Sequence, residues 1–105
     1  MTKHKLASDV IKVSEKDFEK QIRQLAKMFG WSYYHPFLSK WSERGYPDVT
    51  LCRPPRLIMA ELKSDKGKLS PAQAQWLWML RKVPGIEVRI WRPRMLERIA
   101  EILRQ

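Results

Sequence analysis

The chain has 105 residues, which is enough for one compact domain and too short for two hydrophobic cores. Its 44% hydrophobic fraction argues against wholesale disorder. There are 21 Lys and Arg against 11 Asp and Glu, a formal net charge of +10. Such an excess favours a polyanionic partner (DNA, RNA or an anionic membrane surface), and nucleic acid leads because positive charge recurs along nearly the whole chain.

Several features bear on the compartment and on metal chemistry. The sequence contains no run of about 18 apolar residues, the length of a transmembrane helix. Residues 1–13 lack the apolar segment of a secretory signal. Cys52 is the single cysteine, so it forms no intrachain disulfide and no cysteine zinc site, and His4 and His35 are isolated. We therefore expect an intracellular protein that does not bind structural zinc.

The first element is predicted to be a helix over residues 15–29. Residues 1–13 carry little pattern and are expected to form a loose arm before a single domain over 14–105. Ser14 is a suitable N-cap and Gly30 a suitable stop after the last helical residue. Apolar side chains recur between them at helical spacing: Phe18, Ile22, Leu25 and Phe29.

A basic stripe accompanies this apolar stripe, offset by two residues and on roughly the opposite helix face. It is made of Lys16, Lys20, Arg23 and Lys27. One interpretation is a solvated face, and the other is a row of cations that contacts phosphates. The sequence by itself favours neither.

The rest of the chain alternates between strand and helix patterns. We predict a strand over 31–37, a loop over 38–47, a strand over 48–52, a proline turn over 53–56, a strand over 57–63 and a Lys-rich loop over 64–69. Ser70 caps a helix that begins at Pro71 and runs to about residue 82. A strand over 86–91 follows, then a helix from Pro93 whose core face is Met95, Leu96, Ile99, Ile102 and Leu103. This order predicts an α/β domain with one central sheet.

The hairpin around the proline turn brings two acids together. The simplest register across the turn pairs Cys52 with Leu57. Counting outward, Asp48 falls opposite Glu61, with Cβ atoms about 4.5–5.5 Å apart on one face of the sheet. Lys63 lies two residues beyond Glu61 and therefore on the same face.

This pair of acids suggests a metal site. Two carboxylates held so close repel each other, and a divalent cation such as Mg²⁺ or Mn²⁺ resolves the conflict through hard oxygen ligands. Lys63 would then stabilise charge that develops on a phosphate. The alternative is that Glu61 and Lys63 form an ordinary exposed salt bridge on a strand. The matched Asp48, which follows the tight turn Gly45-Tyr46-Pro47, favours the metal site.

Three motifs in order resemble the virus-type replication-repair nuclease (VRR-NUC) family of the PD-(D/E)XK nuclease superfamily, over roughly residues 14–103. They are Gly45-Tyr46-Pro47-Asp48, Glu61-Leu62-Lys63-Ser64, and Gly67-Lys68-Leu69-Ser70-Pro71-Ala72-Gln73 with Trp76-Leu77. The resemblance implies a restriction-endonuclease-like αβββαβα core with a central mixed sheet flanked by helices. It also implies that Asp48 and Glu61 bind Mg²⁺ or Mn²⁺ and that Lys63 assists catalysis.

The resemblance implies two further site residues, a glutamate of the first helix and a glutamine after the Ser-Pro motif. Glu19 is the best match for the glutamate, which would join the metal site. Its alternative role is a surface partner for Arg23, one turn further on. Gln73 matches the glutamine, and its alternative role is to complete a capping box at the helix start. Gln75 is a weaker match.

The remaining expectations concern partners. Arg44, Lys66 and Lys68 flank the predicted site and are candidates to hold phosphates, although simple solubility explains them equally well. The helix from Pro71 carries apolar residues around most of its circumference, which favours a homodimer. The residues expected at that interface are Trp76, Trp78 and Met79.

These observations predict a metal-dependent, structure-selective DNA endonuclease. Compact stand-alone members of the family resemble Holliday junction resolvases, and a two-fold enzyme suits a nearly two-fold junction. By the same resemblance the host process would be DNA repair or phage DNA processing. The alternatives are a non-catalytic basic DNA-binding module and a nuclease for flaps, duplex or RNA.

Overall fold

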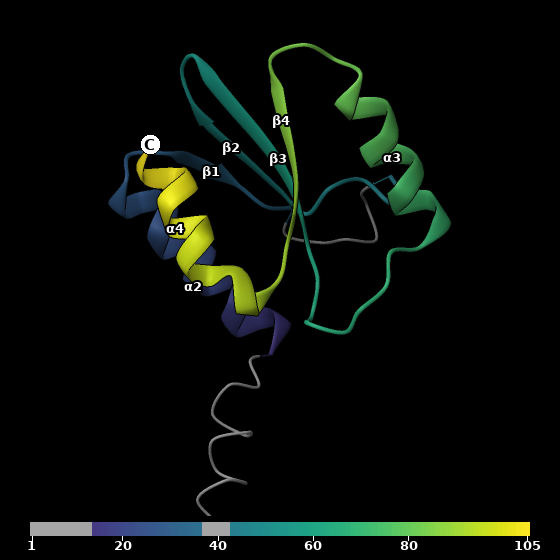
Figure 1. Cartoon of the computed structure of the whole chain (residues 1–105), viewed down its shortest axis with the longest axis horizontal. Coiled ribbons are helices and arrows are strands. Elements are labelled where there is room, and N and C mark those ends of the chain that lie inside the picture. Colours follow the sequence, from purple (N-terminus) through teal and green to yellow (C-terminus); the bar gives the residue numbers. More distant parts are fainter. Residues whose placement is uncertain (1–13, 37–42) are drawn as a thin grey trace, which may run out of the picture.

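One mixed sheet lies between two layers of helices in the computed structural model, which describes residues 14–36 and 43–105 (Figure 1). The elements in order are α2 (Glu15–Met28), β1 (Ser32–Tyr34), β2 (Val49–Arg53), β3 (Arg56–Leu62), α3 (Pro71–Arg81), β4 (Ile86–Trp91), the 3₁₀ helix η2 (Pro93–Met95) and α4 (Leu96–Arg104). The predicted αβββαβα order and α/β class are confirmed. The expected arm over 1–13 and part of the 38–47 loop lie outside the described residues.

The four strands lie in the order β1-β2-β3-β4. The β1–β2 and β2–β3 pairs are antiparallel, and β3 and β4 are parallel, so α3 serves as the crossover between them. The β2–β3 register runs from Cys52↔Leu57 to Val49↔Ala60, as predicted. The next residues outward are Asp48 and Glu61. The loop that follows β3 lies at the opposite end of the sheet from the hairpin turn (Figure 1).

The hydrophobic core lies between the sheet and the pair of helices α2 and α4. Helix α2 begins where predicted, because Ser14 Oγ accepts a hydrogen bond from Asp17 N at 3.1 Å. Its predicted apolar stripe faces the core, with Phe18 and Ile22 fully buried and Ala26 beside them. From the other elements the core takes Trp31, Val49, Leu51, Ile58, Ala60, Trp91, Ile99, Ile102 and Leu103. This packing fixes α2 against the strands that carry the two acids.

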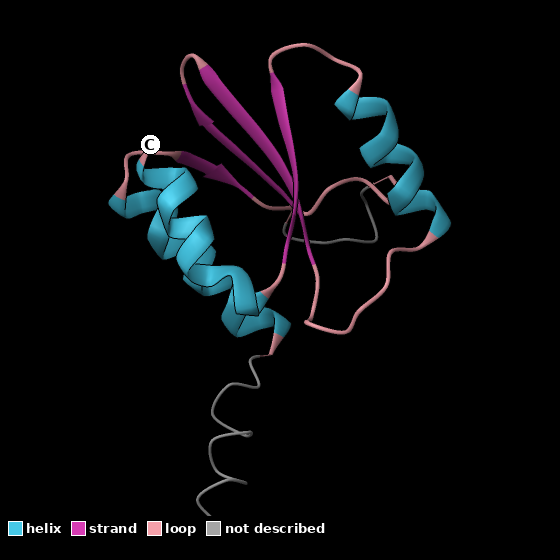
Figure 2. Cartoon of the chain, in the orientation of Figure 1, coloured by secondary structure: helices cyan, strands magenta, loops and turns pink. Residues whose placement is uncertain are grey.

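The other face of the sheet is covered less completely. Helix α3 lies there (Figure 2). Leu77 is its one buried residue. Trp78 is 57% exposed and Met79 is 37% exposed. Helix α3 therefore presents large apolar side chains to the outside of the domain.

Among the described residues, no helix has the length and apolarity needed to cross a membrane.

Most predicted boundaries, including those of β2 and β3, differ from the structure by one residue, and two elements differ by more. Of the strand expected over 31–37, Ser32–Tyr34 form β1, and residue 37 lies outside the described residues. Trp31 turns into the core instead. Its Nε1 donates a hydrogen bond to the carbonyl oxygen of Leu103 at 2.8 Å. The last helix, expected from Pro93, begins with a 3₁₀ turn and becomes α-helical at Leu96.

Candidate active site

All five residues predicted to be catalytic line one cavity of about 340 Å³: Glu19, Asp48, Glu61, Lys63 and Gln73. The cavity lies where α2, β2, β3 and the start of α3 meet. Its wall also includes Glu15, Lys16, His35 and Leu62. Acidic, basic and amide groups thus converge on a space large enough for water, ions and part of a substrate.

The two central acids are held through specific oxygens. Asp48 Oδ2 accepts a hydrogen bond from the backbone N–H of Leu62 at 2.8 Å. Glu61 is only 2% exposed, and its Oε2 accepts from Gln73 Nε2 at 2.7 Å. Its Oε1 is also buried and has no hydrogen-bond partner among the described residues. A buried carboxylate oxygen without a partner is costly, so this atom is suited to bind a cation.

The pKa of Glu61 is also strongly perturbed. Burial, followed by the charge of Asp48, raises the pKa of Glu61 from 4.5 to about 8, while Lys63 acts in the opposite direction. Repulsion between two acids this close disfavours the state in which both are ionised. Strongly perturbed carboxyl groups within a cavity are typical of functional sites.

Gln73 completes the capping box and also contacts the buried acid of the candidate site. Its backbone N–H donates to Ser70 Oγ at 3.1 Å, and its Oε1 accepts from the backbone N–H of Ser70 at 2.8 Å. This capping box starts α3. The same side chain donates through Nε2 to Glu61, so the helix start and the buried acid share one residue. Gln75 is exposed and does not line the cavity.

Glu19 lies in the cavity wall and also contacts Arg23. It lines the cavity, and its Oε2 also accepts a hydrogen bond from Arg23 Nη2 at 3.4 Å. The hydroxyl of Tyr33 donates to the same oxygen. The contact with Tyr33 was missed, because nothing in the local spacing relates the strand residue to the helix.

A family model, the VRR-NUC domain, matches residues 3–94. The chain belongs to the VRR-NUC domain family. Membership makes it a nuclease domain of the PD-(D/E)XK type, with nucleic acid as its substrate, and confirms the resemblance found in the motifs. Comparison with curated proteins and with solved structures gives no match.

PD-(D/E)XK nucleases typically use divalent metal ions, and this VRR-NUC site has suitable donors. Mg²⁺ requires only one or two carboxylates, with water and substrate phosphate completing its shell. Asp48 and the unpartnered oxygen of Glu61 meet that requirement. Within residues 14–36 and 43–105, no group of three His, Cys, Asp or Glu side chains forms a larger cluster. The geometry thus groups Asp48 with Glu61 and leaves Glu19 at the wall of the same cavity.

Arg92 fixes the loop that follows Lys63. Parallel pairing of β3 with β4 continues one step past the strand, where Lys63 N donates to Trp91 O at 3.0 Å. The next residue, Arg92, donates through Nη1 to the carbonyl oxygens of Ser64 at 2.6 Å and Gly67 at 2.7 Å. Arg92 was not among the predicted residues, because only the pairing of β4 with β3 brings it to this loop.

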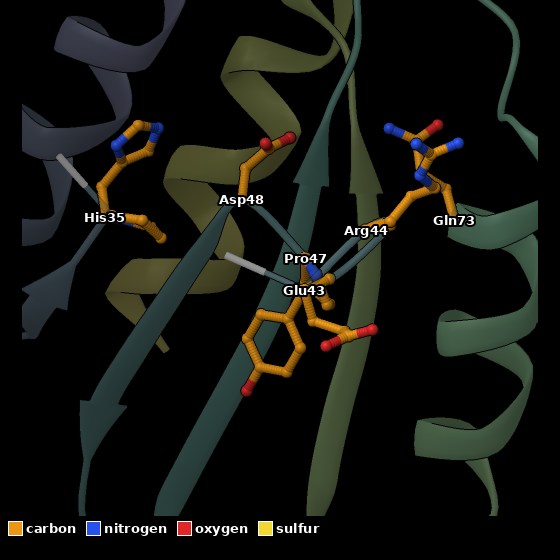
Figure 3. Close-up of a pocket in the computed structure, with 9 residues that line it drawn as sticks. His35, Glu43, Arg44, Pro47, Asp48 and Gln73 are labelled. Atoms are coloured by element: carbon orange, nitrogen blue, oxygen red, sulfur yellow. The ribbon is translucent and has the colours of Figure 1, made fainter. Parts of the chain in front are cut away.

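A second cavity of about 210 Å³ adjoins the first and shares His35, Asp48 and Gln73 with it. The turn over residues 43–47 forms its wall. In Figure 3, Asp48 lies between His35 on one side and Arg44 and Gln73 on the other. His35 was considered only as a zinc ligand, so its position in the walls of both cavities was not predicted. The site therefore extends beyond the two acids toward a histidine and an arginine.

Gly45 allows this wall to approach α3, and we expect Gly45→Ala to destabilise the domain by about 2–5 kcal/mol. The backbone of Gly45 has φ +82°, and an added Cβ would lie 2.5 Å from the carbonyl carbon of Ala72. Denaturant unfolding measures the loss. Gly30→Ala is the matched control, because Gly30 has φ +80° and open space around it, so only about 1–2 kcal/mol of backbone strain applies. Equal losses in the two variants would contradict a steric role for Gly45.

The seven residues predicted to bind DNA divide into groups. All are exposed: Lys16, Lys20, Arg23, Lys27, Arg44, Lys66 and Lys68. Lys16 lines the first cavity and Arg44 the second. Lys20 and Lys27 line neither, and Arg23 pairs with Glu19. The structure thus brings two of the seven to the site, and DNA binding by all seven stays a prediction.

Proposed function

We propose that this VRR-NUC domain is a Mg²⁺- or Mn²⁺-dependent endonuclease that hydrolyses phosphodiester bonds in DNA. The observation that carries the proposal is the buried Glu61, whose Oε1 lacks a partner and whose neighbour is a second carboxylate. A purely structural site would gain nothing from such a pair, since burying uncompensated charge is unfavourable. A non-catalytic binding module, which the net charge of +10 also fits, does not account for it.

In this proposal each side chain has a separate task. Asp48 and Glu61 hold the cation, which supplies Lewis-acid polarisation of the phosphoryl group and lowers the pKa of bound water. Gln73 holds Glu61 in place through its amide. Lys63, half-buried on the cavity wall, stabilises the negative charge that grows on the phosphate in the transition state. Arg44 and His35 extend from the second cavity toward the flanking nucleotide.

We propose further that the active form is a homodimer that acts on branched DNA, with four-way junctions as the preferred substrate. Trp78 and Met79 present a large apolar surface on α3, which a second copy would cover. Trp76 is half-buried and packs edge-on against Tyr46, with ring centroids 5.0 Å apart, so it would contribute less to an interface than the other two. A two-fold dimer would place one site on each of two strands.

An end-labelled four-way junction, with duplex, flap and RNA controls, tests the proposal. In Mg²⁺ or Mn²⁺ the wild type is expected to nick the junction symmetrically near the branch. Glu61→Ala is expected to leave the junction uncut in Mg²⁺ or Mn²⁺. Its binding to the junction, measured in Ca²⁺, is expected to persist. Binding without metal-dependent cleavage of any substrate would leave a basic DNA-binding module. Preferential cleavage of RNA, flaps or plain duplex would replace the proposed substrate.

The dimer has a separate test. Trp78→Glu is expected to convert the protein to a monomer by light scattering and to abolish paired nicks. Met28→Glu is the matched control, because Met28 is 70% exposed on α2, in the opposite helix layer. A wild-type monomer, or equal effects of the two substitutions, would contradict an interface on α3.

A further inference from the structure

Glu19 of the nuclease site is held by a contact that crosses from helix α2 to strand β1. The Tyr33 hydroxyl donates a hydrogen bond to Glu19 Oε2. Arg23 Nη2 reaches the same oxygen at 3.4 Å, and its guanidinium carbon lies 4.7 Å from the centre of the Tyr33 ring. None of the described hydrogen bonds uses the other oxygen, Oε1. Both described contacts of the Glu19 carboxylate thus use one oxygen, Oε2.

Tyr33 is the stronger of the two partners. The Arg23 side chain is 59% exposed and lies one helical turn from Glu19, and exposed ion pairs of this kind contribute little. Tyr33 has a short, rigid side chain that packs against the hydrophobic core. Its bond to a carboxylate is charge-assisted.

The position of Tyr33 in the sheet explains what this bond accomplishes. Tyr33 pairs with Leu51 on β2, the strand that Asp48 immediately precedes. The bond to Glu19 therefore joins α2 to the part of the sheet that holds the candidate metal ligand. Without it, the helix residue would depend on the exposed ion pair alone for its orientation.

We propose that Tyr33 is a positioning residue that fixes the orientation of the Glu19 carboxylate at the wall of the cavity that contains Asp48 and Glu61. The role rests on the proposed function, in which Asp48 and Glu61 hold the cation. With Oε2 occupied by Tyr33 and Arg23, Glu19 would act through Oε1, on a water bound to the cation that Asp48 and Glu61 would hold. Removing a residue that orients a metal ligand in this way typically lowers metal affinity or activity by about 10–100-fold.

Tyr33→Phe removes the hydroxyl and keeps the ring in the core. Mn²⁺ affinity, measured by calorimetry without DNA, is expected to fall about 10-fold, and kcat about 10–100-fold with little change in KM for DNA. Tyr34→Phe is the matched control, because Tyr34 is the next residue, is 64% exposed and makes none of the hydrogen bonds described to Glu19. Arg23→Ala is expected to have a smaller effect than Tyr33→Phe.

The two readouts separate this proposal from the proposed function. Wild type that binds Mn²⁺ but cuts nothing would contradict the nuclease mechanism, while the Mn²⁺ affinity of Tyr33→Phe would still test the positioning role. A Tyr33→Phe protein with unchanged Mn²⁺ affinity and unchanged kcat would overturn the role. So would a variant that loses only thermal stability, or an Arg23→Ala protein that is more impaired than Tyr33→Phe.

Discussion

Lys63→Met is expected to slow cleavage by about 10²–10³-fold in single-turnover experiments with saturating DNA and Mg²⁺, the range typical of a lost electrostatic contact to a transition state. Lys63 lines the cavity that contains Asp48 and Glu61, and its charge lowers the pKa of Glu61 against the rise that burial causes. Its charge matters most when negative charge grows on the phosphate. Ground-state binding of DNA, measured in Ca²⁺, should change little, because many other cations contribute to it.

Lys68→Met is the matched control for this effect. Lys68 lies in the same loop and is exposed, and it lines neither cavity. Its loss should weaken binding modestly and reduce the salt dependence of affinity, with the single-turnover rate at saturating DNA unchanged. A similar loss of rate in the two variants would assign Lys63 to general phosphate binding rather than to catalysis.

Glu61→Gln is expected to make the metal-free protein more stable at alkaline pH while it abolishes cleavage. The pKa of Glu61 is raised to about 8 in the folded state. In the unfolded chain it is about 4.3, so between these pH values the folded state holds one proton more than the unfolded state. Stability conferred by this proton is complete at low pH and declines by about 1.4 kcal/mol per pH unit as the pH rises through this window. Glutamine does not titrate, so the decline disappears.

Denaturant unfolding in a chelator, from pH 5 to pH 9, measures the difference between wild type and Glu61→Gln. The difference in the free energy of unfolding should increasingly favour the variant as the pH rises to about 8, and should then level off. Addition of Mg²⁺ should stabilise the wild type at the alkaline end, because a cation replaces the proton, and should leave Glu61→Gln nearly unchanged. A difference that stays constant across pH would mean that Glu61 is ionised throughout, contrary to its surroundings.

The sequence by itself determined most of the secondary structure and the hairpin register that brings the two acids close together. Ser14 and Ser70 mark helix starts through local caps, and apolar periodicity identifies the buried faces. A strand alternates its side chains with period two, so one correct pair in the β2–β3 hairpin fixes every other pair. For that reason the proximity of Asp48 and Glu61 followed from counting alone.

Only the tertiary structure decided the contacts that join distant elements. Three such contacts depend on how the elements pack together. They are the hydrogen bond between Tyr33 and Glu19, the hydrogen bonds from Arg92 to the loop after Lys63, and the approach of Gly45 to α3. Local spacing contains no record of such packing. It also decided that Gln73 caps its helix and holds Glu61 at once, because the register of β3 and the direction of α3 together bring the amide to the buried acid.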